Sequence, residues 1–175
     1  MKIISHRGNI RGRVPGRENA PSYIDCALGN GYDAEIDVWS IDGEFWLGHD
    51  EPQYKVTWNW FFKRQDNLWL HCKNAQAAKD CQVFQSFCHT GDPYSYTSNG
   101  KIWLHDTEQT FDDKTIIPLL EWDLVDSFKH NIDEVPYGIC TDYPYMLPRQ
   151  ESHYVTLVDL EVIKSVMKII SNTFV

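Results

Sequence analysis

The chain has 175 residues, of which 42% are hydrophobic and 14% are aromatic. This length and composition predict one compact globular domain over residues 1–175, with enough apolar surface for a single core. The formal net charge of −9 argues against binding to nucleic acid, because affinity for a phosphate backbone comes mainly from clustered Lys and Arg side chains. Any anionic ligand must therefore meet locally placed positive charge.

The five cysteines lack the Cys-x-x-Cys spacing of a structural zinc site, and a chain of this size does not depend on disulfides to fold. We therefore expect reduced, mostly buried thiols. The sequence opens on a strand-like segment rather than a signal peptide, and no run reaches the roughly 18 apolar residues of a membrane span. A cytoplasmic location is the expectation, and the oligomeric state stays open.

Strand-like and helix-like patterns alternate along the chain. Short apolar or alternating runs predict strands, and apolar residues at helical spacing predict helices. In chain order we expect a strand over 2–5, a helix over 20–28, a hairpin of strands over 34–40 and 44–47, a helix over 58–63, a strand over 68–73, a helix over 75–82, strands over 83–88, 101–105, 116–121 and 137–141, and a closing amphipathic helix over 155–175.

This alternation predicts an α/β fold with a mostly parallel sheet, either open or closed into a barrel. In such sheets the chemistry gathers where loops follow the carboxyl ends of the strands. Polar side chains fall at these predicted ends, namely His6, Glu35, Asp37, His71, Lys73, His89, Glu121, Thr141 and Asp142. We therefore expect a functional site at this edge of the sheet.

Glu35 and Asp37 lie two residues apart, so on a strand they share one face. Two carboxylates on one buried face repel each other unless a cation or a base neutralises them. A divalent metal ion is the simplest solution. The alternative is a solvated strand face, with the intervening apolar side chains directed toward the core.

Five ordered motifs in the first fifty residues resemble the amino-terminal signature of the glycerophosphodiester phosphodiesterase family. They are His6-Arg7-Gly8, Glu18-Asn19, the run Asp33 to Val38, Asp42-Gly43 and His49-Asp50. More weakly, residues 70–73 resemble the family's Glu-x-Lys strand, and residues 138–144 resemble its last-strand motif Gly-Ile-x-Thr-Asp-x-Pro. The resemblance spans about residues 3–148 and implies a TIM-type barrel of the phosphatidylinositol phospholipase C-like superfamily.

The resemblance also implies an activity, the hydrolysis of phosphodiesters with a divalent cation. His6 and His49 would be the acid and the base, a role that suits imidazoles titrating near neutrality. Arg7 and Lys73 would bind the substrate phosphate. In the family, a neighbouring substrate hydroxyl is usually proposed to attack phosphorus and give a cyclic phosphate, which water can then open.

Glu35 and Asp37 would hold the metal, with Mg²⁺ or Ca²⁺ expected because hard cations prefer oxygen ligands. The family's third metal carboxylate is replaced here by His71, which opens the site to Mn²⁺ or Zn²⁺. Other carboxylates could restore the missing ligand, namely Glu121, Asp92 and Glu18, or Glu18 could instead order the first loop. The sequence does not decide between these.

The chain is shorter than a complete eight-fold barrel, which typically needs about 250 residues. We count about seven sheet strands besides the hairpin. The predicted fold is therefore an abridged TIM-type barrel with mostly parallel strands and fewer elements than the full form.

Three functions remain open. The first is a metal-dependent phosphodiesterase acting on a small glycerophosphodiester-like substrate. The second is a non-catalytic barrel that binds a phosphorylated ligand, which intact His6, His49, Glu35 and Asp37 argue against. The third is a zinc protein built from His71, Cys72, Cys81, Cys88 and His89. It is disfavoured because His71 and Cys72 are adjacent on a strand and point to opposite faces.

Overall fold

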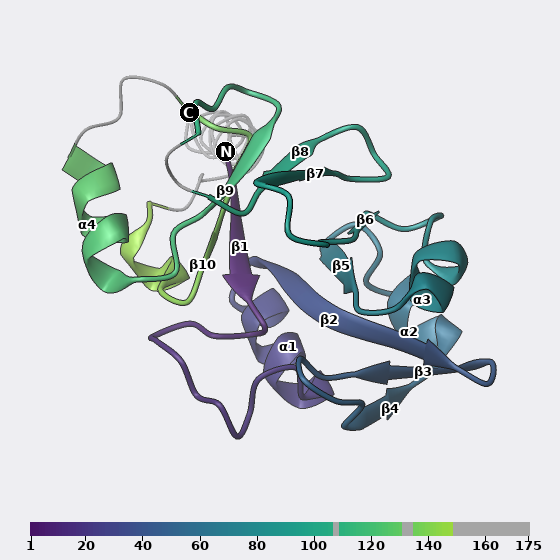
Figure 1. Ribbon diagram of the computed structural model, residues 1–175. Coiled ribbons are helices and arrows are strands. Elements are labelled where there is room, and N and C mark those ends of the chain that lie inside the picture. Colours follow the sequence, from purple (N-terminus) through teal and green to yellow (C-terminus); the bar gives the residue numbers. More distant parts are fainter. Residues whose placement is uncertain (107–108, 131–134, 149–175) are drawn as a thin grey trace, which may run out of the picture.

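The computed structural model describes residues 1–106, 109–130 and 135–148. The helix predicted over 155–175 lies outside these residues. Strands and helices alternate through most of the described chain (Figure 1). In order, the elements are β1 (Lys2–His6), α1 (Pro21–Gly29), β2 (Asp33–Ile41), β3 (Glu44–Leu47), β4 (Tyr54–Val56), α2 (Trp58–Phe62), β5 (Leu68–Cys72), α3 (Ala75–Asp80), β6 (Ser86–Phe87), β7 (Tyr94–Tyr96), β8 (Ile102–Leu104), β9 (Thr115–Pro118), α4 (Trp122–His130), β10 (Gly138–Thr141) and the 3-10 turn η1 (Pro144–Met146).

Ten strands of the described chain form one sheet that is mostly parallel. Strand β1 lies in the middle, paired in parallel with β2 on one side and with β10 on the other. Beyond β2 come β5 and β6, and beyond β10 come β9 and β8, all in parallel pairs. Antiparallel pairing joins β3 to β2 and β4, and β7 to β8. The mixed α/β class and the mostly parallel sheet are confirmed.

The sheet curls into a half barrel, so that its two parallel ends, β6 and β8, approach each other. Phe87 of β6 stacks on Trp103 of β8 with ring centroids 4.2 Å apart. Among the described residues, no backbone pairing joins β6 to β8. This arrangement is compatible with a barrel-like fold.

Side chains of the strands alternate between the outside and the inside of the curl. Outward-facing apolar residues of β2 and β5 pack against helices α1, α2 and α3, while α4 packs near β9 and β10 (Figure 1). Inward-facing residues form a second apolar layer, namely Ile4, Trp69, Phe87, Trp103, Ile116 and Cys140. Two residues further along the chain, five of these six positions are followed by a polar residue, namely His6, His71, His89, His105 and Asp142, while Pro118 follows Ile116. The site therefore rests on this apolar layer.

The sequence does not predict several elements that the structure contains. Strands β4 and β7 have three residues each, too few for a period to show. Helix α4 was also not predicted; it buries Val125, and Phe128 packs against the same apolar cluster. The strand predicted over 116–121 ends at Pro118, and the strand predicted over 83–88 is reduced to Ser86–Phe87. None of the described helices is long and apolar enough to cross a lipid bilayer.

Candidate functional site

Three predicted ligands gather on the inner face of β2 and β5. Glu35 and Asp37 are 3% and 0% exposed, so both carboxyl groups lie inside the curl. Backbone register places His71 beside Asp37, and its Nδ1 lies 3.1 Å from Asp37 Oδ1 and 3.7 Å from Glu35 Oε1. One ligand atom from each residue lies within 4.8 Å of the others. These side chains form a group that could hold a metal ion.

Positive groups and one amide surround Asp37. Arg7 Nε lies 2.9 Å from Asp37 Oδ2, and Lys73 Nζ lies 3.5 Å from Oδ1. Asn19 donates its side-chain amide to Asp37 Oδ2 at 2.9 Å and accepts the Asp37 backbone N–H at 2.9 Å. Arg7 and Lys73, which were expected to bind phosphate, therefore both contact Asp37, which was expected to bind the metal.

The two carboxyl groups have opposite pKa shifts. Burial and the neighbouring Asp37 charge raise the pKa of Glu35. Burial also disfavours the charged form of Asp37, but His71 and Arg7 beside it lower its pKa below the ordinary value. Glu35 Oε2 makes no hydrogen bond among the described residues, whereas Asp37 Oδ1 faces His71 Nδ1 and Lys73 Nζ. A buried oxygen without a donor, such as Glu35 Oε2, suits a cation, because it otherwise loses its hydration without replacement.

His6 is oriented by a residue from the other end of the chain. Its Nδ1 lies 2.8 Å from Asp142 Oδ1, directly after β10. A carboxylate only accepts hydrogen bonds, so His6 carries a proton on Nδ1. Its Nε2 then faces the acidic group, 3.9 Å from Glu35 Oε2. Asn9 donates to the same Asp142 oxygen at 2.7 Å, which fixes the carboxylate.

The sequence places Asp142 among the polar strand ends and in the last-strand motif of the family resemblance, but it does not predict His6 as its partner, and it gives Asn9 no role. The signal for such a partner is the strand order, because β10 lies beside β1 in register from Lys2–Gly138 to Ser5–Thr141. That pairing cannot be read from local sequence.

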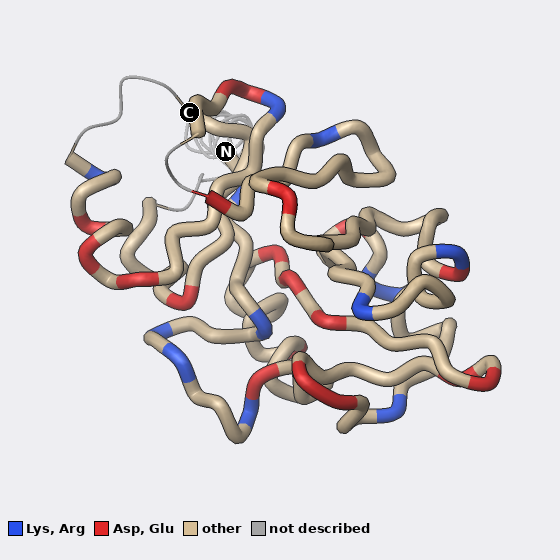
Figure 2. The backbone as a smooth tube through the Cα atoms, in the orientation of Figure 1, with Lys and Arg blue, Asp and Glu red and all other residues tan. Residues whose placement is uncertain are grey.

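Glu18 lies with the basic loop rather than with the acidic group. Its carboxylate accepts hydrogen bonds from Arg7 Nη1 at 3.2 Å, Asn9 Nδ2 at 3.0 Å and Arg13 Nε at 3.3 Å. Burial opposes ionisation, but the bonds from Asn9 and Arg7 lower the pKa of Glu18 overall. Figure 2 shows acidic positions along β2 and basic positions along the loop after β1. In the structure Glu18 therefore orders this loop.

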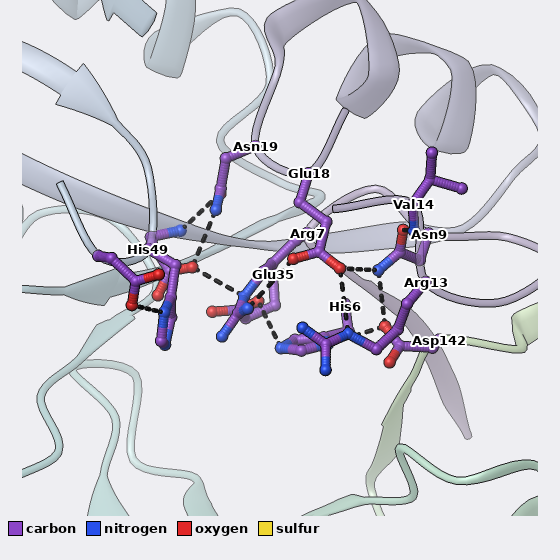
Figure 3. A network of polar contacts seen from close by, with 12 residues as sticks. His6, Arg7, Asn9, Arg13, Val14, Glu18, Asn19, Glu35, His49 and Asp142 are labelled. Carbon is purple, nitrogen blue, oxygen red and sulfur yellow. Dashed lines mark hydrogen bonds and ion pairs between the residues drawn. The ribbon is translucent and has the colours of Figure 1, made fainter. Parts of the chain in front are cut away.

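His49 lies at the end of the β2–β3 hairpin. Gly48 donates its N–H to Asp37 O at 3.1 Å and accepts from Trp39 Nε1 at 2.7 Å, so the backbone before His49 is held on β2. The His49 side chain is 40% exposed, and its Nδ1 lies 2.7 Å from Asp50 Oδ1. In the view of Figure 3, His49 and His6 lie on either side of Glu35.

Glu121 is not part of this arrangement in the described chain. It is exposed and lies just before α4. The group of potential metal ligands consists of residues on β2 and β5. Of the carboxylates considered as substitutes for the third ligand, Glu121 and Glu18 are therefore placed elsewhere.

A cavity of about 190 Å³ opens beside the carboxylates, between the two ends of the curled sheet. Histidines line it from four strand ends, namely His6, His71, His89 and His105, together with Arg7 and Glu35. The rings of His89 and His105 lie 3.6 Å apart between centroids. His105 had no predicted role, although its strand was expected over 101–105.

His105 is held in one tautomer. Ser95 donates its hydroxyl to Cys88 O, so the Ser95 oxygen must accept from His105 Nε2, 2.7 Å away. Burial and the neighbouring His89 lower the pKa of His105 to about 4. The ring is therefore neutral at physiological pH and places little positive charge at the cavity.

The sequence matches no protein-family model, and a comparison with curated proteins finds no match either.

Proposed function

We propose that the protein is a metal-dependent phosphodiesterase of the glycerophosphodiester phosphodiesterase type, built on an abridged TIM-type barrel. The observation that carries the proposal is the buried group of Glu35, Asp37 and His71. It lies at the carboxyl ends of parallel strands, next to Arg7 and a cavity of about 190 Å³. Acidic ligands, phosphate-binding cations and imidazoles are the parts that metal-assisted phosphoryl chemistry needs.

Glu35, Asp37 and His71 would hold the cation. Their donor set of two carboxylates and one imidazole fits Mg²⁺, Ca²⁺ or Mn²⁺, and the imidazole also admits Zn²⁺. A bound divalent cation would neutralise the negative charge that develops on the phosphoryl oxygens. The Glu35 Oε2 atom, which lacks a hydrogen bond among the described residues, supports this assignment.

Arg7 and Lys73 would bind the phosphate of the substrate. Both cations lie beside Asp37, and both side chains are mostly buried, so they act in a medium where charge interactions are strong. A bound substrate phosphate would share the positive charges of Arg7 and Lys73 with Asp37. The cavity of about 190 Å³ beside Arg7 would suit a small alcohol or head group.

His6 would donate or accept the catalytic proton through its Nε2 atom. Its Nδ1–H is bonded to Asp142, so Nε2 is the free nitrogen and faces the cavity. Asp142 acts as a positioning residue because it fixes the ring and the tautomer, the role that carboxylates have beside catalytic imidazoles. His49, held beside β2 by Gly48, would be the second imidazole of the pair.

The test is a screen of small phosphodiesters, including glycerophosphocholine, glycerophosphoinositol and bis-p-nitrophenyl phosphate, with Mg²⁺, Ca²⁺, Mn²⁺ or EDTA. We expect metal-dependent turnover that falls by about 10²–10⁴-fold in His6→Gln and in His49→Gln. His130→Gln, at an exposed histidine of α4, is the matched control. Turnover that survives EDTA, or that survives both substitutions, contradicts the proposal.

A second candidate is a barrel that binds a phosphorylated ligand without turnover. The observation in its favour is that Arg7, His71 and Lys73 already surround Asp37, so the carboxylate has positive partners without a metal. Isothermal titration with glycerol phosphate separates the two candidates. Binding that EDTA leaves unchanged, without hydrolysis of any diester in the screen, supports the second.

A further inference from the structure

Three free thiols lie together on the outer side of β5 and β6. Cys72 is the last residue of β5, Cys81 follows α3, and Cys88 follows β6. Cys72 and Cys81 belong to the same apolar cluster. Because His71 faces the inner site, its neighbour Cys72 faces outward, as expected for adjacent strand residues.

Backbone register brings Cys72 and Cys88 side by side. Strands β5 and β6 pair in parallel, with Leu70 opposite Ser86 and His71 opposite Phe87. The next residues in this register are the two cysteines. Neighbouring strands lie about 4.8 Å apart, which falls within the Cα separations of about 4.4–6.8 Å that a disulfide spans.

The side chains of these cysteines interact. Hydrogen bonding to Cys81, burial and the nearby Cys88 all raise the pKa of the Cys72 thiol. Burial raises the pKa of Cys88, although its contact with Cys72 partly opposes this.

The three thiols differ in their access to solvent. Cys72 is 5% exposed and Cys81 is fully buried. Cys88 is exposed and lines a hollow of about 690 Å³, together with Ala78 and Gln82 from the segment around α3. A small oxidant in solution can therefore reach Cys88, and Cys72 is its thiol neighbour on β5.

We propose that Cys88 and Cys72 form a reversible disulfide when the protein meets a peroxide. The Cys88 sulfur attacks the O–O bond and becomes a sulfenic acid, with release of water when hydrogen peroxide is the oxidant. The Cys72 sulfur then displaces the hydroxyl group as a second water and closes the S–S bond. Overall, two thiols lose two hydrogen atoms and two electrons, and hydrogen peroxide is reduced to two waters.

This disulfide would lie beside the inner site, because both cysteines are adjacent in sequence to residues at that site. Cys72 lies between His71 and Lys73, and Cys88 directly precedes His89. A disulfide therefore fixes the carboxyl ends of β5 and β6, which carry these residues on the opposite face. A thiol reductant such as dithiothreitol restores the starting state.

The test treats the full chain with hydrogen peroxide, blocks remaining thiols and maps the cross-link by mass spectrometry. Trypsin releases Cys72 in peptide 65–73, and chymotrypsin cleaves after Phe84 and Phe87 to separate Cys81 from Cys88. We expect the Cys72–Cys88 cross-link in the wild type, no intramolecular cross-link to Cys72 in Cys88→Ser, and full reversal by dithiothreitol. Cys26→Ser, which removes an exposed cysteine of α1, is the matched control and should leave the yield unchanged.

Other results overturn the proposal. These are a cross-link that joins Cys81 instead of Cys88, a cross-link that persists in Cys88→Ser, or oxidation of Cys88 to sulfinic acid with no cross-link. Cys72→Ser gives a second check, because Cys88 sulfenic acid should then accumulate and react with dimedone. If Cys72→Ser does not fold, Cys88→Ser still decides the question, because its side chain is exposed.

Discussion

Replacing Glu35 and Asp37 of β2 by their amides should change stability in opposite directions. Glu35→Gln keeps the shape of a buried side chain and removes a charge whose Oε2 has no hydrogen bond. Asp37→Asn removes a charge that lies 2.9 Å from Arg7 Nε and 3.1 Å from His71 Nδ1. The two residues are equally buried and lie on one strand, so each serves as the control for the other.

The magnitudes follow from these contacts. Burying an unbonded charged oxygen beside Asp37 costs more than burying a neutral amide, so Glu35→Gln should raise the free energy of unfolding by about 1 kcal/mol without metal. Breaking a buried ion pair costs about 3–5 kcal/mol, so Asp37→Asn should lower it by about 3 kcal/mol. With metal at 100 times its Kd, the wild type gains about 2.7 kcal/mol, and a tenfold weaker variant gains about 1.4 kcal/mol.

The assay is urea unfolding followed by tryptophan fluorescence, in EDTA and in Mn²⁺. We expect Glu35→Gln to be the most stable protein in EDTA and to gain least from Mn²⁺. If Glu35→Gln is less stable than the wild type in EDTA, the buried charge is better solvated than its contacts indicate. If Mn²⁺ stabilises the wild type and Glu35→Gln equally, Glu35 is not a metal ligand.

Further predictions concern the groups that frame the site. Gly48 has φ +148°, and an added Cβ would meet Glu51 O, so Gly48→Ala should lower the Tm by several degrees, measured by circular dichroism. Asp142→Ala leaves the His6 Nδ1 donor unbonded and should lower the free energy of unfolding by about 1–3 kcal/mol, measured in urea; an unchanged midpoint would contradict the positioning role. The pKa of His105 is about 4 in the folded chain, below the ordinary 6.5, so its contribution to stability is full above pH 6.5 and is lost as pH falls toward 4. His105→Gln should therefore flatten the pH dependence of unfolding in this range, and an unchanged slope would count against it.

Much of the fold follows from local patterns. The strands that form the parallel sheet were all expected, because each is a short apolar run bounded by polar or glycine-containing turns. The alternation on β2 placed Glu35 and Asp37 on one face, and the structure shows both on the inner face. Elements of three residues, β4 and β7, carry too little pattern to be recognised.

The part of the site that lies on β2 and β5 was predictable, because these strands are close in sequence and neighbours in the sheet. Glu35, Asp37 and His71 come from β2 and β5, whose order follows the chain. The partner of His6 was not predictable in this way, since Asp142 is 136 residues away and meets it through the pairing of β10 with β1. The cavity histidines His89 and His105 meet because the sheet curls and brings its two ends together.

The sequence by itself determined which side chains share a face of each strand, because strand periodicity is local and alternates strictly with residue number. It also placed the polar residues at strand ends, where the apolar layer beneath them ends. Only the tertiary structure decided which of these residues touch. Strand order and curl depend on contacts between distant segments, and these contacts set the hydrogen bonds, the burial and the pKa shifts of the site.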